Sequence, residues 1–240
     1  DEATKVWDII ESFYKSVGFE ELKIRLSLRD PNTPEKYKGS EEVWKKSENQ
    51  LREIIQKKGA EYFEAEGEAA FYGPKIDFIS RDSLSREWQV ATIQADRSMP
   101  ESFDLNCINE KGEKERVIMI HAAIMGSIER FLSIFIEHTN GNFPFWISPV
   151  QAKIIPIAEA HFEFAQKIKE QLADFRIEID DSKDSFGKKV RNAKTEKVPY
   201  FIIIGDKDME ANKVTLESRD EGQIGQLSIE ELIERFKKEN

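Results

Sequence analysis

The chain has 240 residues and a formal net charge of -10, with 39% hydrophobic and 34% charged residues. That length can hold two domains, and the hydrophobic content is typical of a globular protein rather than a disordered one. A single cysteine excludes an internal disulfide, and no apolar run approaches the roughly 20 residues of a membrane helix. We expect no membrane segment and no secretory signal, and a cytoplasmic location, with an organellar precursor as the alternative.

Helical and strand patterns alternate in the first half. Apolar residues at helical spacing predict a helix over residues 3–17, with a core-facing side made of Val6, Ile9, Ile10, Phe13 and Tyr14. A strand is predicted at 22–28, and a helix is predicted to start at Ser40 and to continue over 41–58. The other expected strands are 75–79 and 86–94, joined by 82–85, and 105–109 and 114–120 around a turn at 109–112. This order predicts a mainly antiparallel sheet with packed helices.

Residues 121–131 are predicted to form an amphipathic helix. At about 100° per residue, one narrow arc holds the proposed core-facing residues Ile124, Ile128, Phe131 and Phe135. Gly126, Ser127 and Arg130 then lie on the opposite side. A helical glycine costs about 1 kcal/mol, and a phosphate or carboxylate held by Arg130 close to the backbone would explain it. A solvated face with a tolerated glycine is the alternative.

Three uncharged polar residues, Gln89, Thr92 and Gln94, lie on a single predicted strand. Buried amides and hydroxyls need hydrogen-bond partners. A bound small polar molecule could supply them, and neighbouring strands or water could do so equally. The residues alone leave both interpretations open.

The second half alternates strands and helices after Pro149. Strands are expected at 152–157, 176–180, 199–204, 214–218 and 223–227, and helices at 159–173 and 186–197. Ser228 and Glu231 have the spacing of a capping box for a last helix. The pattern predicts a mixed, partly parallel sheet covered on both faces.

Three segments carry a family resemblance: YGPKIDF from Tyr72, REWQVATIQAD from Arg86 and MIHAAIMGSIERF from Met119. In this order they resemble the later part of the catalytic domain of class II threonyl-tRNA synthetases, and GSIERF resembles the third signature motif of that class. The similarity continues through FPFWISPVQAKIIPI, from Phe143, into a C-terminal anticodon-binding domain. The resemblance implies an α+β first domain at 1–146, with a partial class II antiparallel sheet, and an α/β anticodon-binding domain with a mixed sheet at 147–240.

Site residues follow from the resemblance. Arg130 and Lys75 are implied to be catalytic, with Arg130 on an ATP phosphate. The implied pocket for ATP and the aminoacyl-adenylate comprises Tyr72, Lys75, Gln89, Thr92, Gln94, Gly126, Ser127 and Arg130. His121 matches the last of three zinc ligands, one Cys and two His in the family, although a lone histidine is more often structural. The implied cofactors are ATP with Mg²⁺, and Zn²⁺ in the complete enzyme.

The resemblance places the first two signature motifs and the other zinc ligands upstream of Asp1. The complete enzyme would activate threonine with ATP and transfer it to tRNA(Thr) as a homodimer. We expect the chain alone neither to form the adenylate nor to bind zinc tightly, because one ligand cannot hold a catalytic zinc. Ala91, Ala122, Lys183 and Glu217 depart from residues common in the family.

The implied anticodon contacts are Lys183, Lys188, Arg191, Lys207 and Asp208. Neither half of the chain is basic, so any RNA surface must be a local patch. The densest positive run comprises Lys183, Lys188, Lys189, Arg191, Lys194 and Lys197. A solvated helix face is the alternative for this run. The alternative function is that of a stand-alone, catalytically inactive synthetase paralogue acting as an RNA-binding or regulatory module.

Overall fold

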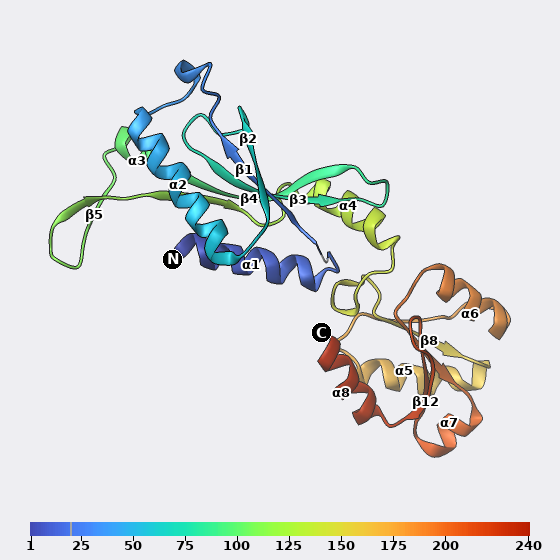
Figure 1. The fold of residues 1–240 in the computed structure, drawn as a ribbon. Coiled ribbons are helices and arrows are strands. Elements are labelled where there is room, and N and C mark those ends of the chain that lie inside the picture. Colours follow the sequence, from blue (N-terminus) through green and yellow to red (C-terminus); the bar gives the residue numbers. More distant parts are fainter. Residues whose placement is uncertain (20) are drawn as a thin grey trace. The chain divides into compact units, whose positions relative to one another are not determined.

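The computed structural model describes residues 1–19 and 21–240. The chain forms two compact units, Asp1–His138 and Thr139–Asn240, and each unit is a sheet with packed helices (Figure 1). The predicted sequence of an α+β unit followed by an α/β unit is confirmed. The boundary between residues 146 and 147 stays a prediction.

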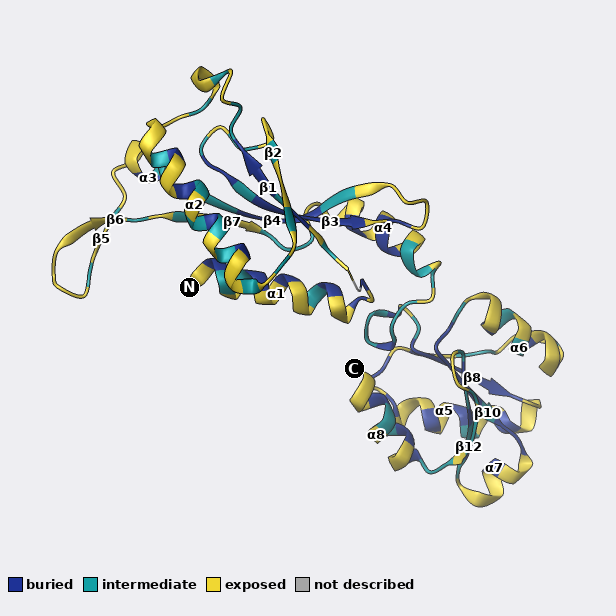
Figure 2. Cartoon of the chain, viewed as in Figure 1, coloured by how far each residue is buried: buried dark blue, intermediate teal, exposed yellow. Residues whose placement is uncertain are grey.

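The first unit is built on a five-stranded sheet in the order β2-β1-β3-β4-β7. Its strands are β1 (Lys23–Leu28), β2 (Tyr62–Glu66), β3 (Lys75–Arg81), β4 (Glu87–Asp96) and β7 (Met119–Ala123). Its helices are α1 (Glu2–Ser16), the 3-10 turn η1 (Pro34–Lys36), α2 (Glu41–Lys58), α3 (Ser98–Ser102) and α4 (Ile128–Thr139). Only the β1–β2 pair of this sheet is parallel. A separate hairpin of β5 (Asn106–Ile108) and β6 (Lys114–Arg116) carries largely exposed residues (Figure 2).

One face of this sheet is apolar and covered by helices. Trp7 of α1 packs edge-on against Phe78 of β3, with 4.8 Å between ring centroids. Helix α2 lies beside α1, because Lys58 bridges to Asp8 at 2.6 Å and to Glu11 at 2.9 Å. Helix α2 is confirmed over Glu41–Lys58, and Ser40 caps it by accepting a hydrogen bond from Val43 N. The core of the unit therefore lies under α1 and α2.

A β-bulge interrupts the β3–β4 pairing. Phe78 pairs with Ala91, but Ile79 pairs with Gln89, so Val90 is an extra residue on β4. The bulge brings the Gln89 side chain to the same face as Thr92, although the two residues are three apart. The Val90 carbonyl accepts a hydrogen bond from the Tyr14 hydroxyl at 3.0 Å.

The predicted helix over residues 121–131 is wrong in its first half. His121 and Ala123 belong to strand β7, and α4 begins only at Ile128. Gly126, at φ +64°, makes a left-handed turn between them. Ile128 is 57% exposed and Ile9 of α1 is 55% exposed, so neither belongs to the core that we predicted.

The second unit has a five-stranded mixed sheet in the order β12-β11-β10-β8-β9. Its strands are β8 (Ala152–Pro156), β9 (Ile177–Ile179), β10 (Tyr200–Ile204), β11 (Val214–Ser218) and β12 (Gly222–Leu227). Its helices are η2 (Phe145–Ile147), η3 (Glu159–His161), α5 (Phe162–Gln171), α6 (Phe186–Thr195), α7 (Asp206–Ala211) and α8 (Ile229–Glu239). Strands β9, β8 and β10 are parallel to one another, and β11 and β12 are antiparallel to their neighbours.

Helices cover both faces of the second sheet. Ile154 packs with Ile168 of α5 and Phe236 of α8 in one core cluster. Its neighbour Ile155 packs with Ala193 of α6 in another. Because successive strand residues point to opposite faces, α6 lies across the sheet from α5 and α8, as the sequence pattern predicts. The capping box of α8 is also confirmed: Ser228 Oγ accepts from Glu231 N at 3.2 Å, and Glu231 Oε2 accepts from Ser228 N at 2.7 Å.

Within residues 1–19 and 21–240, no helix combines the length and the apolar character needed to cross a bilayer.

Candidate functional site

The face of the first sheet opposite α1 is polar. Lys75 pairs with Gln94, Asp77 with Thr92, and Gln94 with His121 across three neighbouring strands. Cross-strand partners share a face, so these five side chains project to the same side. The structure therefore brings together residues that the sequence placed on separate segments.

Asp77 is the centre of this face and is completely buried. One oxygen, Oδ1, accepts hydrogen bonds from Thr92 Oγ1 at 2.8 Å and Gln89 Nε2 at 2.9 Å. The other oxygen, Oδ2, accepts from Ser27 Oγ at 2.6 Å and lies 3.4 Å from Lys75 Nζ. Buried carboxylates require such partners. Gln89 and Thr92, predicted to face a ligand, are thus held in place by a neighbouring carboxylate.

Arg25 is a site residue that the sequence interpretation missed. Its Nη2 group lies 3.0 Å from both Asp77 Oδ2 and Gln89 Oε1, and Nη1 lies 3.6 Å from Glu68. Its buried Nε finds no hydrogen-bond partner among the described residues. The alternation of polar and apolar residues in β1 could have revealed it, because Arg25 and Ser27 are polar positions of that strand and face the same side.

Tyr72, Gln94 and His121 form a second polar group on this face. The Tyr72 hydroxyl hydrogen-bonds Gln94 Oε1, and its ring lies 5.0 Å from the His121 ring. Burial, together with the negative charge of Asp96, raises the pKa of Tyr72, so the phenol remains a hydrogen-bond donor at neutral pH. His121 Nε2 in turn lies 2.9 Å from Asp96 Oδ2.

Gly126, Ser127 and Arg130 lie at the start of α4. The positive φ of Gly126 gives a backbone reason for the glycine, and a Cβ atom there would lie 3.0 Å from Arg130 Nη2. Ser127 Oγ accepts from Arg130 N at 3.3 Å. No interaction within the described chain joins the Arg130 side chain to Lys75 or Gln94, and their convergence on one ligand stays a prediction.

Zinc does not fit the residues present. No three His, Cys, Asp or Glu side chains come together as a metal site in the described ranges 1–19 and 21–240. A catalytic zinc needs about three protein ligands, and His121 supplies at most one. Cys107 is exposed on the β5–β6 hairpin.

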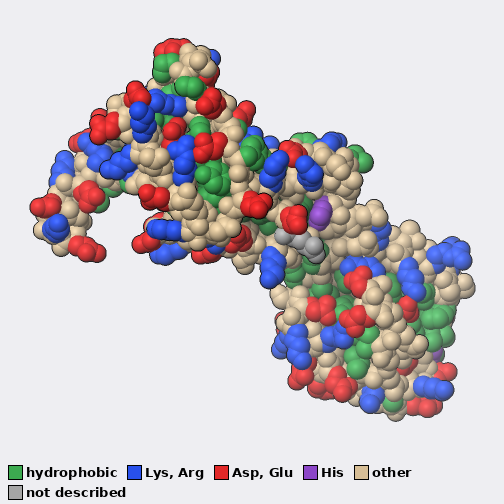
Figure 3. All heavy atoms as spheres, viewed as in Figure 1, with side chains coloured by type: hydrophobic (Ala, Val, Ile, Leu, Met, Phe, Trp, Pro, Cys, Tyr) green, Lys and Arg blue, Asp and Glu red, His purple; other side chains and the backbone are tan. Residues whose placement is uncertain are grey.

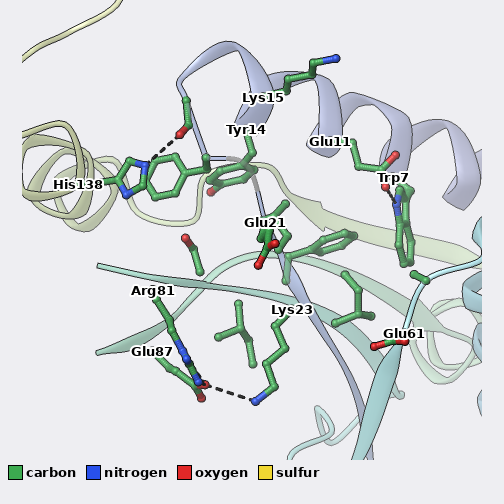
Figure 4. A pocket seen from close by; sticks show the side chains of 18 residues that line it. Trp7, Glu11, Tyr14, Lys15, Glu21, Lys23, Glu61, Arg81, Glu87 and His138 are labelled. Atoms are coloured by element: carbon green, nitrogen blue, oxygen red, sulfur yellow. Dashed lines mark hydrogen bonds and ion pairs between the residues drawn. The ribbon is translucent and has the colours of Figure 1, made fainter. Parts of the chain in front are cut away.

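A cavity of 1430 Å³ lies away from the polar face. It opens at the end of the sheet where β1 begins and β3 ends, between Tyr14 of α1 and the ion pairs of Glu87 with Lys23 and Arg81 (Figure 4). The described residues that line it include none of the predicted site residues.

In the second unit, three of the six cations of the predicted positive run form salt bridges with acids among the described residues. Lys188 bridges to Asp184 at 2.8 Å, and Lys194 bridges to Glu217 at 2.6 Å. Lys189 is 8% exposed and donates to the Asp180 carbonyl at 3.0 Å. Among the residues that the structure describes, no acid forms a salt bridge with the exposed Lys183, Arg191 or Lys207. On the face that Figure 3 shows, acidic and basic side chains are intermixed on each unit.

Asp208 is buried and serves its own unit. Its Oδ2 accepts from Gly205 N at 3.0 Å, and Oδ1 accepts from Thr215 Oγ1 at 2.8 Å and Gln226 Nε2 at 3.0 Å. Thr215 and Glu217 alternate with core residues on β11, so they lie on the α6 face of the sheet and are partly exposed. This face therefore carries polar groups on the same side of the sheet as α6, the helix that holds Arg191.

Comparison with known proteins identifies the class. Residues 1–139 match the family model described as tRNA synthetase class II core domain (G, H, P, S and T), and residues 151–239 match the anticodon binding domain. The chain belongs to the class II aminoacyl-tRNA synthetases. The class II core fragment that we expected, followed by an anticodon-binding domain, is thereby confirmed.

The particular resemblance is to threonine enzymes. The chain is 43% identical to the threonine–tRNA ligase of Prosthecochloris aestuarii and 45% identical to that of Clostridioides difficile, each over 241 residues. The match includes 100% of this chain but only 37% of the length of these curated relatives. A solved RNA binding domain of threonyl-tRNA synthetase from Cryptosporidium parvum superposes with a TM-score of 0.90 at 34% identity, covering 100% of this chain and 60% of that one. A putative threonyl-tRNA synthetase from Aeropyrum pernix gives a TM-score of 0.75 at 29% identity, with coverages of 98% and 60%.

Proposed function

We propose that this chain is part of a threonine–tRNA ligase. The complete protein would join threonine to ATP, releasing pyrophosphate and forming threonyl-adenylate, and would then transfer the threonyl group to tRNA(Thr). The observation that carries the proposal is the 43% identity to threonine–tRNA ligases over the whole chain. The polar face around Asp77 supports it, since that face supplies donors and acceptors for a small polar substrate.

The proposed roles follow the chemistry of each side chain. Lys75 and Arg130 would neutralise phosphate charge, and Mg²⁺ would enter with ATP. Tyr72 and Gln94 would contact the adenylate by hydrogen bonds. Gln89 and Thr92 would contribute the hydrogen-bonding groups that are not already bonded to Asp77, such as the second N–H of the Gln89 amide. Gly126 and Ser127 would let the ligand approach the start of α4.

The described residues of the chain form no complete metal site, and we propose that the chain by itself neither forms the adenylate nor holds zinc tightly. His121 would be one ligand in the complete protein. The complete protein would act as a homodimer in the cytoplasm.

We propose the α6 face of the second unit as the anticodon surface. Its unpaired cations Lys183, Arg191 and Lys207 are free to meet phosphates. Lys188 could do so only in competition with Asp184. Asp208 would act indirectly, by holding Thr215 and Gln226 in position.

A second candidate is a catalytically inactive paralogue that binds RNA or regulates. The observation that favours it is Glu217, which places a carboxylate on the proposed RNA face and ties up Lys194. An acidic residue there weakens phosphate binding. Such a residue would be expected in a protein that does not carry out ordinary anticodon recognition.

Threonine-dependent exchange of pyrophosphate into ATP by the complete natural protein separates these candidates. We expect exchange, lowered about 100-fold in Lys75→Ala because one charged donor at the transition state is lost. Lys46→Ala, an exposed lysine on α2, is the matched control and should retain full activity. The isolated chain should show no exchange above its own Lys75→Ala background. Absence of exchange by the complete protein would refute the ligase proposal and favour the paralogue.

A further inference from the structure

Asp96 makes a set of hydrogen bonds that the proposed reaction does not use. Its side chain is completely buried at the end of β4. Oδ1 accepts from the backbone N–H groups of Ser98 and Met99, both at 2.9 Å, at the start of α3. Oδ2 lies 2.9 Å from His121 Nε2. One oxygen therefore serves the backbone and the other serves the histidine ring.

This arrangement determines where the histidine proton lies. A carboxylate only accepts hydrogen bonds, so the proton of a neutral His121 must be on Nε2. Its lone pair is then on Nδ1. No described residue hydrogen-bonds Nδ1, and the His121 side chain is 38% exposed. The neighbouring Tyr72 hydroxyl is already bonded to Gln94.

We propose that Asp96 is a positioning residue that fixes the Nε2–H tautomer of His121, so that the ring presents an unprotonated Nδ1 to the polar face. In this chain that nitrogen can accept a hydrogen bond from an N–H or O–H donor. In the complete protein it is the same atom through which His121 would bind zinc, so the identity of its occupant rests on the proposed function. The tautomer does not, because it follows from groups of this chain alone.

The structure provides a shape-matched way to invert the tautomer. In Asp96→Asn, the two backbone N–H groups of Ser98 and Met99 require an oxygen, so they hold the amide oxygen at the Oδ1 position. The amide NH₂ must then face His121. An N–H donor at that place requires an acceptor, and the ring proton moves from Nε2 to Nδ1.

The experiment is a long-range ¹H–¹⁵N correlation spectrum of the ¹⁵N-labelled chain, without ligand, at about pH 8. The nitrogen shifts in this spectrum themselves distinguish neutral from charged rings, and the tautomer is assigned from neutral rings. The chain has 3 histidines, and the His121 signals are those lost in His121→Gln. We expect a protonated Nε2 and an unprotonated Nδ1 for His121, and the opposite pattern in Asp96→Asn.

The other two histidines are controls within the same spectrum. His138 Nε2 lies 2.9 Å from the Gly18 carbonyl. His161 Nδ1 accepts from Ala158 N at 3.1 Å, while its Nε2 faces Asp206 at 2.9 Å. Both should keep the Nε2 proton in every variant, and a change in their signals would reveal unfolding.

Averaged nitrogen shifts or an Nδ1 proton in the unmodified chain would overturn the proposal without any variant. An unchanged His121 pattern in folded Asp96→Asn would overturn it too. If that variant does not fold, Asp96→Ser provides the second test, because serine can still cap α3 but is too short to reach the ring. We expect averaged shifts there, and a retained Nε2 proton would contradict the role of Asp96. The spectra can be interpreted even if the pyrophosphate-exchange assay shows no activity. The two proposals can therefore be refuted independently of each other.

Discussion

The polar face of the first sheet and the charged face of α6 in the second unit use ionic groups in opposite ways. Asp77 has no exposed surface and accepts hydrogen bonds from the two neighbouring strands, β1 and β4. Lys188 on α6 has a side chain that is 61% exposed and meets one acid, four residues earlier. A buried charge must be matched by its whole surroundings, whereas an exposed pair adds little. The comparison teaches that the buried carboxylate is part of the structure of its sheet, because its neighbours satisfy it completely. The exposed cations of α6 add little stability and remain available to bind a partner.

Replacing Asp77 should produce the largest effect. Asp77→Ala leaves the mostly buried Arg25 without its closest carboxylate, and we expect a loss of about 3–5 kcal/mol in the free energy of unfolding. Urea denaturation, followed by tryptophan fluorescence, measures it. Asp184→Ala, which removes the partner of Lys188, is the matched control and should cost at most about 1 kcal/mol. Equal losses of unfolding free energy in Asp77→Ala and Asp184→Ala would show that buried and exposed ionic groups contribute alike, contrary to our expectation.

Asp82 tests an intermediate case, a carboxylate at the β3–β4 connection. Burial alone would raise its pKa, but hydrogen bonds from Trp88, Arg86 and Leu84 lower the pKa to about 2, from an ordinary value of 3.8. A lowered folded-state pKa means stability that is present above about pH 4 and is lost as the pH falls toward 2.

We therefore expect Asp82→Asn to be less stable than the unmodified chain at pH 7, and the difference to shrink between pH 4 and 2. Urea midpoints across that range give the measurement. Asp174→Asn, at an exposed position without a hydrogen bond or ion pair among the described residues, should show no such trend. A difference that stays constant down to pH 2 would contradict the assigned cause.

The smallest effects are expected on α6, and they separate paired from unpaired cations. Lys188→Ala should change the free energy of unfolding by no more than about 0.5 kcal/mol, because an exposed i, i+4 pair contributes little. It should also leave tRNA(Thr) affinity nearly unchanged. Arg191→Ala should weaken binding across all RNA sequences and reduce the salt dependence by about one phosphate contact. Binding at several salt concentrations measures both, and equal effects would show that ion pairing does not decide which cations meet RNA.

Most elements of the fold follow from local pattern, and the exceptions have physical causes. Residues 41–58 were predictable because Ser40 caps a strongly periodic segment. The error at 121–131 arose because Ile124, Ile128 and Phe131 fit a helical arc, while the left-handed Gly126 turn breaks the helix. Strand β2 and helix α7 were missed because both are short, and β2 in addition pairs with a strand that precedes α2 in the chain.

The sequence predicted which residues belong to the candidate site, but it did not predict the hydrogen bonds that they make with one another. Family motifs pointed to Gln89, Thr92 and His121, and alternation put Thr92 and Gln94 on one side of a strand. That Asp77 would occupy Gln89 and Thr92, or that Asp96 would meet His121, depends on side-chain geometry across strands. Lys194 with Glu217 is a similar case, because the pair joins helix α6 to strand β11, and two other elements lie between them in the chain.

Val90, the additional residue on β4, has a consequence for how insertions and deletions act on this protein. Removing it would leave Ala91 paired with Phe78 and Gln89 with Ile79 in a regular ladder, so Gln89 would stay on the same face as Thr92. The same deletion would take from Tyr14 the carbonyl that its hydroxyl now meets. A deletion at this position would thus leave the polar face in register while removing the acceptor of the Tyr14 hydroxyl, whereas a substitution of the Val90 side chain would keep that carbonyl.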